Sequence, residues 1–145
     1  MDGSARTRAP IEFDGNRLLR AMGRADRDLL RPHLHPIELR KGMVLIEAGE
    51  DVTRCYFPCD GTIAALVVAL PDGTLTETAT VGREGAIGGI VSLGQKPAFA
   101  RAVVQVGGNA LWIDSERLEA CKDSSNSFRD LISRYADCLL AQVLQ

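Results

Sequence analysis

The sequence of 145 residues contains no apolar stretch long enough to cross a membrane. Its longest uninterrupted apolar run, from Ile63 to Leu70, has eight residues, whereas a transmembrane helix requires about twenty. The first residues are polar and lack the apolar core of a secretory signal peptide. We therefore expect no membrane contact and a cytoplasmic location.

The chain also lacks an excess of basic residues. Its 17 Lys and Arg residues are balanced by 19 Asp and Glu residues, which gives a formal net charge of -2. A domain that binds nucleic acid by itself usually carries net positive charge, because phosphate contacts dominate its affinity. We therefore expect that these residues do not bind DNA. A local basic patch that contacts nucleic acid is the alternative.

Residues that ligate metals are few. The chain has four cysteines, of which only Cys55 and Cys59 are close in sequence, and its two histidines are His33 and His35. A zinc or iron–sulfur site needs a second thiolate pair or histidines at ligand spacing. A metal-binding jelly roll of the cupin kind needs a third histidine beside an H-x-H pair. We therefore expect no metal and reduced, partly buried thiols.

What is present is a succession of helix, strands and helix. A polar tail over residues 1–14, predicted to be flexible, is followed by a single domain over residues 15–145. Apolar residues from Leu18 to Leu30 recur at helical spacing, with an interruption at Gly23 and a stop at Pro32. The pattern predicts a short helical lid before the strands.

Glycines divide residues 35–113 into short runs rich in β-branched residues, a pattern typical of strands. The segments Asp60-Gly61 and Pro71-Asp72-Gly73 predict hairpins, because glycine supplies the positive φ that tight turns between strands require. Roughly eight strands at this spacing predict a sandwich or a jelly-roll barrel.

The most informative segment runs from Gly82 to Val106. It contains the step from Gly88 to Gly89 and, twelve residues after Gly89, Arg101 at the start of an apolar run. Consecutive amides at a Gly-Gly step can face an anion without interference from a Cβ, and an arginine that returns to them can clamp it. The pattern predicts an anion site, and its structural alternative is a glycine-rich hairpin with a surface arginine.

The last segment, residues 124–145, predicts a helix that begins after several potential caps and meets no glycine or proline stop before Gln145. The missing stop suggests a fragment or a shortened product. Two apolar stripes run along the helix. The first comprises Phe128, Leu131, Tyr135 and Cys138, and the second comprises Ile132, Ala136, Leu139 and Val143. If the first covers the domain, the second is left for a partner helix, and we expect a homodimer. A single broad stripe packed on its own domain is the alternative.

This order of elements resembles the sensory domain of Crp/Fnr-type transcription regulators, which has the cyclic-nucleotide-binding fold. The resemblance covers residues 16–145, and its most specific segments are RKGMVLIEAGE, CYFPCDGTIAALVVALPDG, TVGREGAIG and ARAVVQVGGNALWI. It implies a mostly β fold with flanking helices, namely a β-roll or double-stranded jelly-roll barrel with N-terminal helices and a C-terminal dimerisation helix. DNA is then contacted only through a helix-turn-helix domain, which these residues do not include.

The resemblance also implies a site for a cyclic nucleotide or another small anionic ligand. Where cyclic-AMP-binding members have a glycine at the phosphate and a glutamate at the ribose, this chain has Gly88 and Gly89. Arg101 and Ala102 match the arginine and the small residue at the phosphate, and Glu84 is a substitute carboxylate in another register. Loss of a buried carboxylate that accepts a ribose hydroxyl costs about 1.5–3 kcal/mol. We therefore expect weak cyclic AMP binding or none.

The role of Arg101 has an alternative of its own, which is to pair with a carboxylate of the same chain. Three functional hypotheses remain. The first is the sensory and dimerisation domain of a Crp/Fnr-like regulator, without enzymatic activity. The second is a stand-alone cyclic-nucleotide-type module that controls a separate partner, and the third is a jelly-roll metalloenzyme.

Overall fold

The computed structural model describes residues 13–88, 98 and 100–143. The elements among these residues are, in order, α1 (Arg17–Arg20), α2 (Arg24–Leu30), the 3-10 helix η2 (Arg31–His33), β1 (His35–Leu39), β2 (Val44–Ile46), β3 (Arg54–Pro58), β4 (Ile63–Ala69), β5 (Leu75–Val81), β6 (Arg101–Val106), β7 (Gly108–Asp114), α3 (Ser115–Ser124) and α4 (Asn126–Val143). The predicted order of helix, strands and helix is confirmed.

The N-terminal helices break where the sequence predicts. Gly23 is the N-cap of α2, and Pro32 lies in the first turn of η2. Asn16 caps α1, because its side-chain oxygen accepts a hydrogen bond from the backbone N–H of Leu19 at 3.0 Å. The leucines of this segment point into the core, so the two short helices form one lid.

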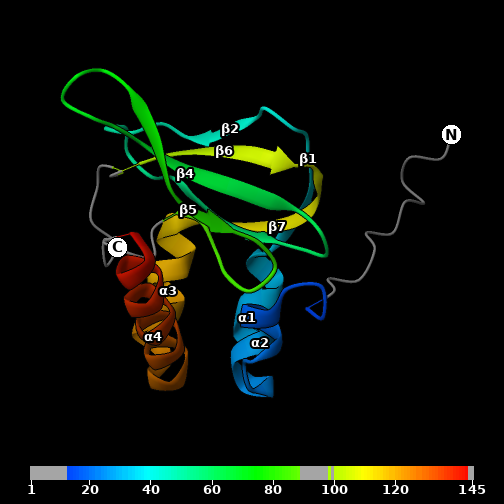
Figure 1. The fold of residues 1–145 in the computed structure, drawn as a ribbon. Coiled ribbons are helices and arrows are strands. Elements are labelled where there is room, and N and C mark those ends of the chain that lie inside the picture. The colour runs from blue at the N-terminus through cyan, green and yellow to red at the C-terminus, as the bar shows by residue number, and fades with distance from the viewer. Residues whose placement is uncertain (1–12, 89–97, 99, 144–145) are drawn as a thin grey trace, which may run out of the picture.

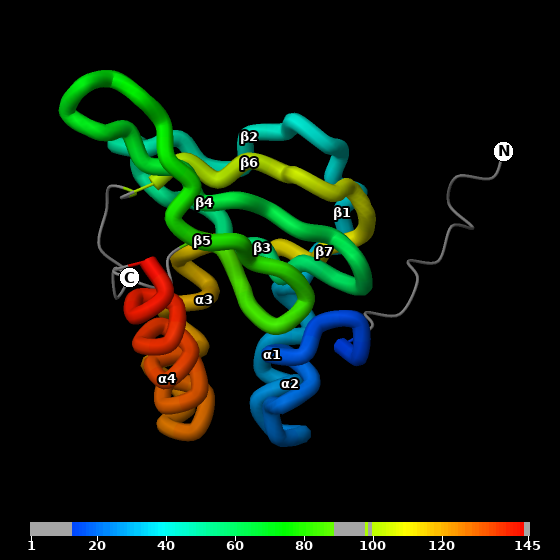
Figure 2. The backbone as a smooth tube through the Cα atoms, viewed as in Figure 1, coloured from blue at the N-terminus to red at the C-terminus, as the bar shows by residue number. Residues whose placement is uncertain are grey.

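The strands form two antiparallel sheets. The three-stranded sheet has the order β1-β7-β3, and the four-stranded sheet has the order β2-β6-β4-β5. This is the predicted β-roll, but the sheets are not closed into a barrel, and the described residues contain seven strands. Figures 1 and 2 show the helices gathered on one side of the two sheets.

The two predicted hairpins have different outcomes. Pro71-Asp72-Gly73 closes the hairpin between β4 and β5, with Gly73 at a φ of 89°. Asp60-Gly61 instead joins β3 to β4, which belong to different sheets, and the positive φ of 54° falls on Asp60. The hairpin prediction at Asp60-Gly61 is wrong because β3 pairs with β7 and β4 pairs with β5 and β6.

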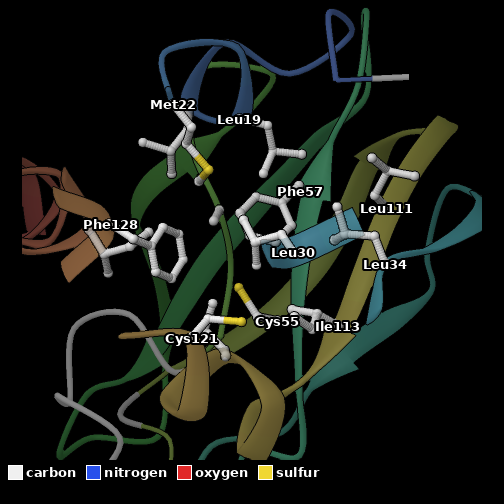
Figure 3. Packing of buried hydrophobic residues seen from close by; sticks show 14 of the residues in the cluster. Leu19, Met22, Leu30, Leu34, Cys55, Phe57, Leu111, Ile113, Cys121 and Phe128 are labelled. Carbon is white, nitrogen blue, oxygen red and sulfur yellow. The ribbon is translucent and has the colours of Figure 1, made fainter. Parts of the chain in front are cut away.

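The larger hydrophobic cluster lies between the helices and the three-stranded sheet. Figure 3 shows side chains that meet there from the lid, from both β3 and β7, and from the helices that follow the strands: Leu19, Leu30, Phe57, Leu111, Ile113 and Phe128. A second cluster lies between the two sheets and contains Tyr56, Leu66, Val81, Ala102 and Leu139. Helix α4 therefore contributes to both clusters.

The structure does not leave the second stripe of α4 free. Ile132, Ala136 and Leu139 are 1%, 7% and 5% exposed within the single chain. Val143 is half-buried and packs against the cluster between the sheets. The two predicted stripes are adjacent on the helix, so one broad face spans both clusters, as in the alternative. Dimerisation stays a prediction, but these side chains are occupied by their own domain.

Candidate functional site

The segment from Gly82 to Gly88 leads from β5 toward the predicted anion site and is pinned to β3. Tyr56 and Ile87 exchange two backbone hydrogen bonds of 2.8 Å each. Gly88 has a φ of 101°, and a methyl group in place of its hydrogen would overlap the carbonyl oxygen of Arg54. Backbone conformation and close packing therefore both require glycine at this position.

The N-terminal lid holds the same segment from another side. The side-chain amide of Asn16, which is fully buried, donates to the carbonyl oxygens of Pro58 at 2.7 Å and of Gly85 at 2.8 Å. The backbone N–H of Arg17 donates to the carbonyl oxygen of Arg83 at 2.6 Å. The sequence analysis missed Asn16, whose only local signal is an asparagine just before a helical apolar pattern.

Helix α4 holds the segment from a third side through Tyr135. A methyl group at Gly85 would overlap the Tyr135 hydroxyl, and this hydroxyl donates to the carbonyl oxygen of Ala86 at 3.4 Å. Burial raises the pKa of Tyr135 well above its ordinary value, so the phenol stays protonated. The lid, the segment before the anion site and α4 therefore pack as one unit.

Arg101, the first residue of β6, is paired with a carboxylate of its own chain. Its Nε donates to Oε1 of Glu47 at 2.9 Å, and its Nη2 donates to Oε2 at 2.8 Å. Glu47 directly follows β2, and β2 pairs with β6 through Ile46 and Ala102. The pair matches the alternative role of Arg101, and its fork-to-fork geometry is the one in which guanidinium also binds phosphate.

The electrostatics of this pair favour the charged forms of both partners. The hydrogen bonds from Arg101 hold the pKa of Glu47 below its usual value, and Glu47 raises the pKa of Arg101. The side chains of Arg101 and Glu47 are 41% and 38% exposed, so water screens their attraction. An anion in solution can therefore reach the guanidinium.

The other predicted ligand residues lie in different surroundings. Ala102 faces the cluster between the sheets, on the opposite side of β6 from Arg101, and is 1% exposed. Gly89 lies outside the described residues. The Glu84 carboxylate accepts hydrogen bonds from the backbone N–H of Gly82, at 3.0 Å to each oxygen. Glu84 lines a separate groove beside α4, which Arg101 does not line.

The thiols divide into three that are buried and one that is exposed. Cys55, Cys59 and Cys121 are buried, Cys138 is exposed, and all four are free. Burial raises the pKa of Cys55 and Cys121, and it raises the pKa of Cys59 to about 11. Within residues 13–88, 98 and 100–143, no group of three or more His, Cys, Asp or Glu residues is placed to hold a metal ion.

None of the helices described here combines the length and apolar character that crossing a bilayer requires.

Comparisons with known proteins place the fold. No protein-family model and no curated protein matches the chain. Among solved structures, it is similar to the regulatory subunit of a cAMP-independent protein kinase A from Trypanosoma brucei, with a TM-score of 0.72 and 18% identity over 86% of this chain and 44% of that one. The fold is that of a cyclic-nucleotide-binding domain.

Transcription regulators share this fold. The N-terminal domain of a transcriptional regulator from Streptomyces coelicolor A3(2) matches with a TM-score of 0.64 and 21% identity, over 90% of each chain. The catabolite activator protein of Thermus thermophilus matches with a TM-score of 0.65 and 19% identity, over 89% of this chain and 58% of that one. The chain thus spans less than two thirds of the kinase subunit and of the activator protein.

Proposed function

We propose that this domain is the sensory part of a Crp/Fnr-like transcription regulator, that it responds to a small anionic ligand at Arg101, and that it does not bind cyclic AMP tightly. The observation that carries the proposal is the fork-to-fork pair of Arg101 and Glu47. The resemblance assigns this arginine to the ligand phosphate, and in the structure it is already paired with a carboxylate of the same chain.

The pair makes ligand binding an exchange of anions. A phosphate that binds the Nε–Nη2 edge of Arg101 has to displace the Glu47 carboxylate, which already accepts from both donors of that edge. Because both side chains are partly exposed, the displaced carboxylate can turn into water at small cost. The Glu47 carboxylate then competes with the ligand for Arg101 without preventing binding, and a ligand needs further contacts to displace it.

The second argument comes from the ribose position. Gly89, which the sequence matches to the ribose-binding glutamate, offers no carboxylate, and Glu84 is held at Gly82 in a separate groove. Cyclic AMP therefore gains neither the hydrogen bond to its ribose nor an unopposed arginine. The Trypanosoma brucei neighbour is itself described as cAMP-independent, which supports a regulatory role of this fold without that ligand.

A second candidate function is a module that controls a separate partner protein. It is favoured by the neighbours that are regulatory subunits of protein kinases, one of them from Trypanosoma cruzi and bound to guanosine. Reading the gene beyond the codon for Gln145 separates the two candidates. A helix-turn-helix segment there supports the regulator, and a stop codon supports the module.

The ligand side of the proposal is tested by calorimetry with cyclic AMP, inorganic phosphate and guanosine. Arg101→Gln should weaken the binding of the two phosphate compounds and leave that of guanosine unchanged, since guanosine carries no anion. Arg134→Gln, at an exposed position of α4, is the matched control and should leave the binding of all three compounds unchanged. Phosphate binding that is unaffected by Arg101→Gln would place the anion site elsewhere.

A further inference from the structure

A groove beside α4 lies apart from the ion pair of Arg101 and Glu47. Its volume is about 380 Å³, within the usual range for small-molecule sites. Its walls come from β5, from the segment after β5 and from the C-terminal half of α4: Thr80, Glu84, Tyr135, Cys138, Leu139, Ala141 and Gln142. The groove therefore contains neither Arg101 nor Glu47 in its lining.

The charge of this groove is negative. Among the described residues that line it, Glu84 alone is ionised, and the same part of the chain gives Glu84 no ion-pair partner. Both oxygens of the carboxylate accept a hydrogen bond from the backbone N–H of Gly82, which holds the carboxylate in place. Each carboxylate oxygen has further acceptor capacity, so Glu84 can still accept hydrogen bonds from a ligand.

The aromatic wall of the groove is also fixed. Tyr135 fills the space above Gly85, and its hydroxyl is bonded to the backbone of Ala86. The negative face of an aromatic ring attracts a cation. Leu139 and Ala141 supply apolar surface, while Thr80 and Gln142 offer acceptors for N–H groups.

We propose that this groove binds an organic cation, namely a primary ammonium group carried on a small apolar or aromatic skeleton. The ammonium group pairs with Glu84 and lies against Tyr135, and the skeleton covers Leu139 and Ala141. This site is opposite in charge to the one at Arg101 and does not depend on it. Its failure leaves the proposed function untouched.

Cys138 provides the readout because it is the exposed cysteine in the groove wall, while the other three are buried. The rate at which neutral iodoacetamide alkylates Cys138 is followed by mass spectrometry. Phenethylamine should slow this alkylation in a saturable manner. The isosteric 2-phenylethanol and the anionic phenylacetate should need at least about tenfold higher concentrations for the same protection.

Two variants locate the effect. Glu84→Gln retains an oxygen for the Gly82 N–H and should raise the half-protecting phenethylamine concentration by about two- to fivefold, because it removes the charge of an exposed ion pair. Ala141→Leu, at an exposed helix position, fills the groove and should abolish the protection by the amine. Glu116→Gln, at an exposed position of α3, is the matched charge control and should behave as the wild type.

Three results overturn the proposal. They are the absence of protection by phenethylamine, equal protection by 2-phenylethanol, and undiminished protection of Glu84→Gln. The first denies a site, and the other two show that the groove is an apolar surface without preference for a cation.

Discussion

Tyr135 occupies the space that a side chain at residue 85 would fill, so Gly85 and the phenol ring fit together as a matched pair. Because Gly85 lies between β5 and the predicted anion site, the contact ties this segment directly to α4. The sequence analysis recognised the glycines at 88 and 89 as informative but gave no role to Gly85. Its role is to admit the ring from a helix fifty residues further along the chain.

The contact predicts the effect of Gly85→Ala. The added methyl group would overlap the Tyr135 hydroxyl, and overpacking of this kind typically costs about 1–3 kcal/mol. We expect a lower free energy of unfolding in urea. Gly61→Ala is the control, since a methyl group there meets nothing within 4 Å. If both variants are equally stable, α4 does not pack on the segment as described.

Two neighbouring leucines of α4 predict opposite results. Leu139→Asp places a charge in the cluster between the sheets and should lower the unfolding free energy by at least about 3 kcal/mol. Leu140, which is 38% exposed, should accept aspartate with a change within about 0.5 kcal/mol. Urea unfolding and sedimentation of both variants check this. If the Leu139→Asp variant is instead folded and monomeric, the result would support the prediction that Leu139 lies in a dimer interface.

The behaviour of α4 marks one limit of sequence reasoning. The spacing of apolar residues predicts a helix and its apolar face, and the residues that are buried belong to that face. What covers the face depends on two clusters built from residues far away in sequence. The turns have the same limit, since Asp60-Gly61 looks like a hairpin locally and its strands pair elsewhere.

The site was predictable to a similar depth. The position of Arg101 after the glycines was enough to predict that it is a site residue. Its partner Glu47, however, lies 54 residues earlier in the chain. Nothing local links the two, because their contact arises from the pairing of β2 with β6. The sequence offers several potential caps for the last helix, and the structure shows that Ser125 is one that acts. Its hydroxyl accepts a hydrogen bond from the backbone N–H of Phe128 at 3.1 Å.

Asp26 joins the N-terminal lid to the start of α4. Its two oxygens accept from the hydroxyls of Ser125 at 2.5 Å and Ser127 at 2.7 Å, and the residue is 7% exposed. Asp26→Ala should destabilise the fold by about 1–3 kcal/mol, because it removes the partner of both hydroxyls. Thermal unfolding measures the change. Asp28→Asn, at an exposed position of α2, should be neutral, and a neutral Asp26→Ala would deny the link.

The buried thiols predict a loss of stability at high pH. In the folded protein, burial raises the pKa of Cys59 from 9.0 to about 11, while in the unfolded chain the thiol ionises near its ordinary value. Between these values the unfolded state binds fewer protons, so stability falls as pH rises. Urea unfolding from about pH 8 to 11 should show the decline. Cys59→Ala should flatten it in part, whereas Cys138→Ala should leave the slope unchanged.

The most direct test of the account is a calorimetric titration of cyclic AMP into the wild type and into Glu47→Gln. We expect a dissociation constant of tens of micromolar or weaker for the wild type, equivalent to roughly -6 kcal/mol. Because the variant removes the charge that competes for Arg101, it should bind about two- to fivefold more tightly, as expected for a partly exposed ion pair. A submicromolar constant for the wild type, or weaker binding by Glu47→Gln, would contradict the account.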